Sequence, residues 1–177
     1  SEESVSVSVI AASQSQLTLI EGLMQFYIYD FSEMEPEGSE RFIFDAEGRF
    51  APYPGLERYW SLEGFHPLLI EVGGRVAGFA LINTHSHRGG TVERGMAEFF
   101  VARGFRRRGA AAEAVRQILE RFPGQWEVAV AERNIAARTF WPRAIAAAPN
   151  VSGLTQLAGD GEHWRGPIWT FDASPSP

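Results

Sequence analysis

The chain has 177 residues, with 22 acidic side chains against 16 basic ones, and all of those basic residues are arginine. Because cysteine and lysine are both absent, thiol nucleophiles, disulfides, Cys-based zinc sites, Schiff-base catalysis and Walker-type phosphate loops are excluded. A hydrophobic fraction of 45%, a charged fraction of 21% and a net charge of −6 predict an ordinary globular domain. The same balance argues against a nucleic-acid partner.

The start of the chain is polar and serine-rich, unlike a signal peptide, and no apolar run approaches the roughly 20 residues that span a bilayer. We therefore expect a cytoplasmic protein without a membrane partner. A single domain is expected over residues 1–173, followed by a flexible tail at 174–177.

The first elements follow from hydrophobic periodicity. Alternation over Val5–Ile10 predicts a strand, and apolar residues spaced by three and four from Leu17 predict an amphipathic helix that ends near Asp30. Residues 30–50 are irregular and acidic, and a loop with a short helix at Leu56–Leu62 follows.

Two hairpins come next. Leu68–Val72 and Arg75–Asn83 are apolar runs joined by a two-residue glycine turn, which is typical of a tight hairpin. Residues 84–90 predict a longer hairpin loop and Thr91–Val101 a returning strand, with Gly95 marking a bulge.

The C-terminal part reads as alternating helices and strands. A helix over Ala110–Phe122 and a strand over Trp126–Ala131 complete a βαβ unit, so the strands before and after that helix should be parallel. Asn134 can cap a further helix that runs through Ala137 to Phe140 or beyond, although Pro142 should end or kink it. The remaining residues supply one or two closing strands.

The turn between the strand ending at Val101 and the following helix has the features of an anion site. Small residues at Gly109, Ala110 and Ala111 let a bound group approach the backbone. The first unpaired N–H groups of the helix point into this turn with the positive end of the helix dipole.

An arginine cluster borders the same turn. Arg103, Arg106, Arg107 and Arg108 lie within six positions, just before a helix start, where they oppose the dipole unless an anion binds there. The alternative is a basic helix start whose arginines are simply solvated.

The pattern Arg106-x-x-Gly109-x-Ala111, after a strand and at the start of an amphipathic helix, resembles the acyl-CoA-binding motif of the GNAT N-acetyltransferase superfamily. The order of elements agrees from the first strand through the segment 132–141. The resemblance implies a mixed α/β (α+β) fold in a single domain. Its central sheet would be mostly antiparallel, with one parallel pair splayed at the CoA site and helices on both faces.

The resemblance also implies acetyl-CoA as co-substrate. Backbone amides from Arg106 to Ala111 would hold its pyrophosphate, and the pantetheine arm would lie along the strand near Phe100 and Val101. Asn134 would contact the pantetheine or the helix that covers it, although a plain N-cap explains it equally well. The implied binding positions are Phe100, Val101, Arg106, Arg107, Arg108, Gly109, Ala110, Ala111 and Asn134.

Amine acetylation needs a base, because a protonated ammonium has no lone pair, and a donor for the developing oxyanion. Glu98 is the candidate base, with its pKa raised by burial beside Met96 and Phe100. The alternative is a solvent-facing glutamate, since the sequence does not say which face holds the site. The backbone N–H of Val101 is the candidate oxyanion donor.

Trp141 stands where many family members carry a tyrosine acid, and an indole N–H does not protonate a thiolate. The acid is therefore absent, or it is Tyr27, Tyr29 or water. Since a thiol pKa is about 8.5, the thiolate can leave unassisted. The alternative function is a non-catalytic module that binds CoA or another phosphorylated ligand.

The acceptor is a small-molecule or peptide amine that the sequence does not identify. The acidic stretch Asp30–Glu47 either attracts a cationic amine, a polyamine or an amino-sugar, or is a solvated loop. His85 and His87 lack a third ligand, so no metal site is expected. The sequence leaves the oligomeric state open, a homodimer included.

Overall fold

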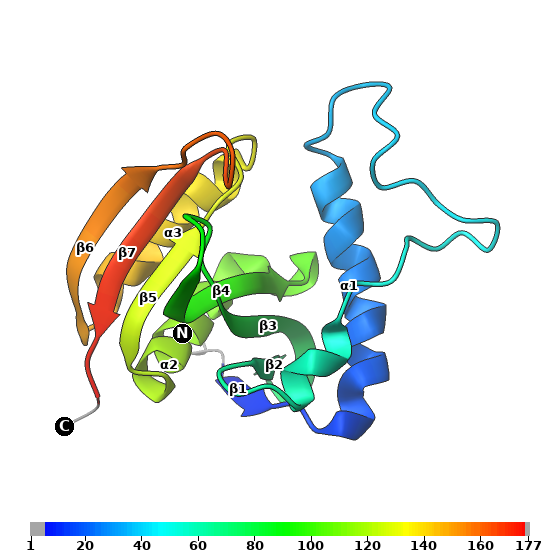
Figure 1. Ribbon diagram of the computed structural model, residues 1–177. Helices are drawn as coiled ribbons and strands as arrows, with labels where there is room; N and C mark the ends of the chain where they lie inside the picture. The colour runs from blue at the N-terminus through cyan, green and yellow to red at the C-terminus, as the bar shows by residue number, and fades with distance from the viewer. Residues whose placement is uncertain (1–5, 176–177) are drawn as a thin grey trace.

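The computed structural model describes residues 6–175, and for Arg107 and Arg108 only the backbone (Figure 1). Its strands are β1 (Val7–Ala11), β2 (His66–Val72), β3 (Arg75–His85), β4 (Thr91–Val101), β5 (Gly124–Ala129), β6 (Val151–Ala158) and β7 (Pro167–Ala173). Its α-helices are α1 (Leu17–Ser32), α2 (Ala110–Arg121) and α3 (Ile135–Ala147). Short 3-10 segments are η1 (Gln14–Gln16), η2 (Leu56–Trp60) and η3 (Arg103–Arg108). The predicted elements are confirmed, apart from Val5 and residues 176–177, which lie outside the described part.

The strands form a seven-stranded sheet in the order β1-β2-β3-β4-β5-β7-β6. All neighbours are antiparallel except β4 and β5, which are parallel because α2 crosses back between them. The mixed α/β sheet with one parallel pair is thus confirmed. Within the described residues, no helix is both long and apolar enough to cross a membrane.

Helices cover both faces of the sheet (Figure 1). The first core, here called the α1-side core, joins α1 to one face through residues such as Ile20, Met24, Leu69, Phe79 and Leu81. The second, the α2/α3-side core, joins α2 and α3 to the other face through residues such as Leu68, Ile70, Val115, Ile118 and Trp126. Alternate side chains of a strand point to opposite faces, so β2 contributes to both cores.

The bulge in β4 lies two positions beyond the predicted one. Gly95 pairs in register with Asn83, but Ile82 pairs with Met96 and Leu81 with Glu98, which makes Ala97 the extra residue. As a result Met96 packs in the α2/α3-side core while Phe100, an even number of positions away, packs in the α1-side core. A second irregularity lies between Gly95 and the hairpin loop, on the N-terminal side of Gly95.

Of the two expected effects of Pro142, an end or a kink of the helix, the end is wrong, because α3 continues through it to Ala147. A proline inside a helix removes one backbone hydrogen bond. Trp141, Ala144 and Ile145 are all buried on either side of it. We attribute the continuation of the helix to this burial.

Candidate active site

The parallel strands separate soon after they meet. β4 and β5 pair only at Arg94 with Trp126 and Gly95 with Glu127. Beyond these pairs a cavity of about 660 Å³ opens between them, within the size range of small-molecule sites. Residues 96–99 of β4 line one side and residues 128–131 line the other. Helix α1, α3, the loop between α1 and η2, His87 of the β3–β4 loop and Trp164 of the β6–β7 loop supply the remaining walls.

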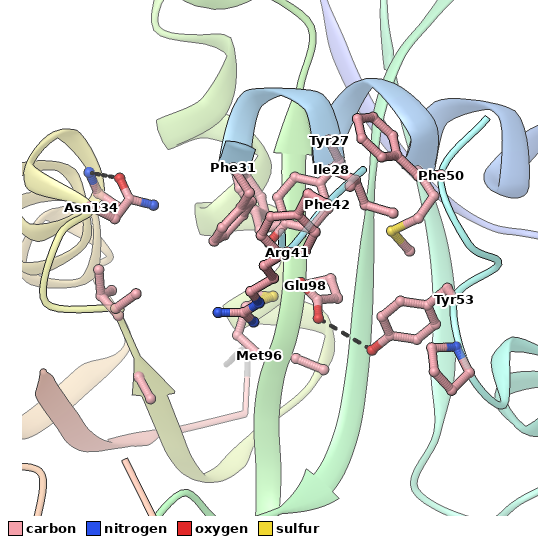
Figure 2. Close-up of a pocket in the computed structure, with 18 of the residues that line it drawn as sticks. Tyr27, Ile28, Phe31, Arg41, Phe42, Phe50, Tyr53, Met96, Glu98 and Asn134 are labelled. Carbon is pink, nitrogen blue, oxygen red and sulfur yellow. Dashed lines mark hydrogen bonds between the residues drawn. The ribbon is translucent and has the colours of Figure 1, made fainter. Parts of the chain in front are cut away.

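Glu98 faces this cavity from β4, beside the bulge (Figure 2). Its carboxylate oxygen Oε1 accepts a hydrogen bond from the Tyr53 hydroxyl at 3.2 Å. Burial raises the pKa of Glu98 to about 7, even though hydrogen bonds from Tyr27 and Tyr53 act to lower it. The carboxylate is therefore placed and tuned to exchange a proton near neutral pH.

Two tyrosines from different segments meet at Glu98. Tyr53 lies between two prolines, and because a following proline disfavours helical backbone, this segment is held extended against the site. Tyr27 comes from α1, and its hydroxyl also accepts the backbone N–H of Phe99. Burial and the neighbouring Glu98 raise the pKa of both phenols, so both stay protonated and act as hydrogen-bond donors.

The end of β4 directs backbone groups into the gap. Ala102 donates its N–H to the Ala77 carbonyl at 2.7 Å, and Val101 lies opposite Gly78. In an antiparallel ladder the bonding direction alternates, so the N–H and C=O of Val101 point away from β3, toward the β5 side. The carbonyl accepts a hydrogen bond from Arg106 Nε at 2.6 Å.

The predicted phosphate cradle, formed by the backbone amides from Arg106 to Ala111, lies at the start of α2. Gly109 caps this helix with φ 72°, a left-handed conformation that favours glycine, and its carbonyl accepts the N–H of Glu113 at 3.1 Å. The first-turn amides of Ala110 and Ala111 have no partner inside the helix. Among the atoms that the structure describes, none beyond the adjoining residues lies within 4 Å of a Cβ built on Gly109, so the described backbone here is open to approach. This geometry fits the pyrophosphate of CoA.

Within the arginine cluster at residues 103–108, the side chains of Arg103 and Arg106 are already ion-paired. Arg103 and Arg106 donate to the two carboxylate oxygens of Asp30, at the C-terminal end of α1, at 2.7 and 2.5 Å. Burial raises the pKa of Asp30, but these hydrogen bonds outweigh it and the pKa is lowered. The cluster was expected to attract an anion, and the carboxylate of Asp30 already supplies one negative charge to it from within the chain.

Asn134 and Trp141 place α3 along the cavity. Asn134 is the N-cap of α3, with its side-chain oxygen accepting the N–H of Ala137 at 3.1 Å, so the capping interpretation is correct (Figure 2). Trp141 is buried and packs edge-on against Phe99, with ring centroids 5.2 Å apart. Phe100 turns its side chain into the α1-side core, which leaves only its backbone for a ligand.

The predicted residues therefore form two neighbouring groups. Glu98 and Asn134 line the cavity, whereas Arg106, Gly109, Ala110 and Ala111 lie beyond the end of β4 and are not part of its walls. Tyr53 was not predicted, because an irregular loop gives no periodicity signal. A tyrosine held between prolines was the one available hint.

Two other sequence hypotheses receive a structural answer. The acidic loop contributes Arg41, Phe42 and Ile43 to the cavity, and none of its carboxylates in the described part of the chain. His85 packs against Phe65 and His87 against Trp164. Over residues 6–175, no group of three or more potential metal ligands occurs.

Comparison with solved structures finds the same overall fold in other proteins. An acetyltransferase from Thermus thermophilus matches with a TM-score of 0.62 at 10% identity, covering 95% of this chain and 97% of that one. Spermidine N-acetyltransferase from Vibrio cholerae, in complex with CoA and spermine, matches at 0.58 and 11% identity, covering 94% and 95%. An aminoglycoside acetyltransferase in complex with coenzyme A matches at 0.58 and 12%, covering 95% of both chains.

No curated protein sequence matches the chain. The family model for acetyltransferases of the GNAT family, however, matches residues 26–145, which run from α1 into α3 and include the splayed strands and the cradle. This match spans more than half of the sequence. The chain belongs to the GNAT family of acetyltransferases.

Proposed function

We propose that this protein transfers an acetyl group from acetyl-CoA directly to a primary amine. The observation that carries the proposal is the position of Glu98, a carboxylate with a pKa of about 7, on the wall of the cavity between the splayed strands. Acetyl-CoA supplies an activated thioester there. The cradle at Gly109–Ala111 would hold its pyrophosphate, and neighbours of the same fold have been crystallised in complex with CoA.

Glu98 acts as the base in this proposal. Its carboxylate takes a proton from the acceptor ammonium, which frees the nitrogen lone pair for attack on the thioester carbonyl. Tyr27 and Tyr53 are positioning residues, because their hydroxyls orient the carboxylate and stay protonated themselves. The Val101 N–H, directed into the gap, stabilises the negative charge that develops on the carbonyl oxygen.

The leaving group then departs without a dedicated acid. The C–N bond forms at the carbonyl carbon, and the adduct then collapses as the C–S bond breaks, with the bonding electron pair leaving on sulfur as a thiolate. The second proton of the attacking nitrogen passes to water or to the departing thiolate, which leaves a neutral amide. Trp141 has no proton to give at neutral pH. Tyr27 has a pKa well above 10, so it is a weaker acid than a thiol of pKa about 8.5 and would not protonate the thiolate favourably. Exposed Tyr29 does not line the cavity, which leaves water.

The test combines binding with turnover. Acetyl-CoA at 100 times its Kd should stabilise the protein by about 2.7 kcal/mol, which for a domain of this size raises the Tm by roughly 5–10 °C. Free-thiol release across a panel of primary amines should then follow. Binding without thiol release from any amine would identify a non-catalytic CoA-binding module, and no thermal shift would contradict both functions.

A further inference from the structure

The walls of the cavity also bear on the identity of the acceptor. Within the described residues, Glu98 is the only acidic residue among those that line it. The surrounding walls are largely aromatic and aliphatic, with Ile28 and Phe31 from α1 and Phe42, Phe50 and Tyr53 from the loop (Figure 2). The cavity thus offers one negative charge inside an apolar enclosure.

Three carboxylates of the nearby acidic stretch already have partners. Asp30 binds Arg103 and Arg106. Asp45 accepts the backbone N–H groups of Glu47 and Arg49 at 2.9 and 3.0 Å. Glu35 pairs with Arg41 at 3.3 Å, so none of these three side chains provides a second negative charge on the cavity wall.

This charge count disfavours a polycationic acceptor. Burying an ammonium without a partner costs several kcal/mol, and a polyamine or an amino-sugar brings more than one. Arg41 also lines the cavity but is paired with Glu35, so this pair adds no net charge to the wall. A single ammonium, by contrast, finds its partner in Glu98.

The loop is held so that its aromatic side chains stay at the cavity. Gln25 of α1 binds both backbone groups of Phe50, accepting its N–H at 2.8 Å and donating to its carbonyl at 3.2 Å. Phe42 has φ 60°, the left-handed region, which is costly for an aromatic residue. Its ring lies under the Arg41 guanidinium, 4.6 Å from ring centroid to Cζ, and Phe42 lines the cavity.

We infer that the acceptor is a primary monoamine that carries an aromatic ring or an apolar group of similar size. The inference rests on the proposed function and narrows its substrate class. The ammonium lies at Glu98, and the ring packs between the apolar residues of α1 and Phe42 of the loop. The likeness to a spermidine acetyltransferase, at 11% identity, is a likeness of fold alone.

The first experiment measures thiol release from acetyl-CoA by the full chain and compares different amines as acceptors. We expect kcat/KM for 2-phenylethylamine to exceed that for spermidine and kanamycin by at least about tenfold, the effect of burying one ring-sized apolar group. A preference for spermidine or kanamycin would overturn the inference and leave the proposed function standing.

Binding separates the two proposals where no amine reacts. Thermal shifts with CoA present and 2-phenylethylamine or spermidine added report occupancy without chemistry. A shift with 2-phenylethylamine alone supports the inference while contradicting catalysis. If neither amine reacts nor shifts the Tm, the inference is wrong, whatever acetyl-CoA itself does.

Phe42 allows a matched pair of variants, since Asn and Asp both tolerate left-handed backbone. Phe42→Asn removes the ring and should lower kcat/KM for 2-phenylethylamine by about tenfold. Phe42→Asp has the same shape but adds a second carboxylate, and should gain activity on spermidine relative to Phe42→Asn. Equal specificity of the two variants, with no loss on 2-phenylethylamine, would contradict the assignment of Phe42 to the acceptor pocket.

Discussion

At the scale of single residues, the site depends on the state of one carboxylate. Glu98 is held by hydroxyl groups from α1 and from the loop, while burial raises its pKa to about 7. A glutamate in water has a pKa near 4.3 and would be ionised throughout the physiological range. Here the pH near neutrality decides whether the base is available.

Glu98→Gln should lower kcat/KM by a factor of about 10²–10⁴, the usual contribution of a general base. In the wild type, kcat/KM should rise with pH through an apparent pKa of about 7 as Glu98 ionises. The variant should lose that rise and still show the full acetyl-CoA thermal shift. Glu21→Gln, at an exposed position on α1, is the control. A Glu98→Gln profile that retains the inflection near 7 would assign the base to another group.

The same substitution has a consequence for stability. Because the folded-state pKa of Glu98 is raised above its unfolded value, the folded protein binds more protons between about pH 4.3 and 7, and its stability falls as pH rises through that window. Glu98→Gln removes the penalty of a buried charge. Its Tm should therefore exceed that of the wild type at pH 8, with the difference shrinking toward pH 5. An equal or lower Tm at pH 8 would mean that the charge is well solvated.

At the scale of elements, the start of α2 and the end of β4 would build the CoA side of the proposed site. Gly109 connects η3 to α2 with φ 72°, and Ala110, the first residue of α2, is buried. The open space around Gly109 leaves room for a phosphate, and a side chain there would fill it.

Gly109→Val should abolish the thermal shift by acetyl-CoA and lower stability by about 1–2 kcal/mol, the cost of a left-handed L-residue. Gly104→Val is the matched control, because Gly104 lies in η3 with open space around it and no positive φ. Its acetyl-CoA shift should stay close to that of the wild type. A full shift in Gly109→Val would place the pyrophosphate elsewhere.

The elements themselves could be predicted from sequence because hydrophobic periodicity determines which residues must be buried. The side of the sheet on which Glu98 lies could not be predicted from sequence. The extra residue Ala97 in β4 reverses the alternation of side chains, and nothing in the local sequence distinguishes this residue. The Asp30–Arg106 pair joins residues 76 positions apart, and Phe42 and Tyr53 lie in a loop without periodicity. The helix start and the left-handed Gly109 of the proposed cradle were predictable because they are local, whereas the walls of the cavity are assembled by tertiary structure.

At the scale of the whole molecule, the sheet ties the two cores together. In β2, Leu68 and Ile70 pack in the α2/α3-side core, while Leu69 between them packs in the α1-side core. In β3, Phe79 and Leu81 alternate in the same way with their neighbours. Neither core can lose its structure without disrupting strands that the other one uses. The active-site cavity lies where this sheet divides, and both cores border it through Met24 and Trp141.

We therefore predict that the chain unfolds as one cooperative unit, in line with the expected single domain. Calorimetry should show a single heat-absorption peak with a calorimetric enthalpy equal to the van't Hoff enthalpy, the signature of two-state unfolding. Acetyl-CoA should move that whole peak to higher temperature, because its site draws on β4, α2 and α3 together. Two resolved peaks, with only one of them shifted by acetyl-CoA, would mean that the sheet divides into independent halves at the β4–β5 gap and that alternation along β2 and β3 does not couple the cores.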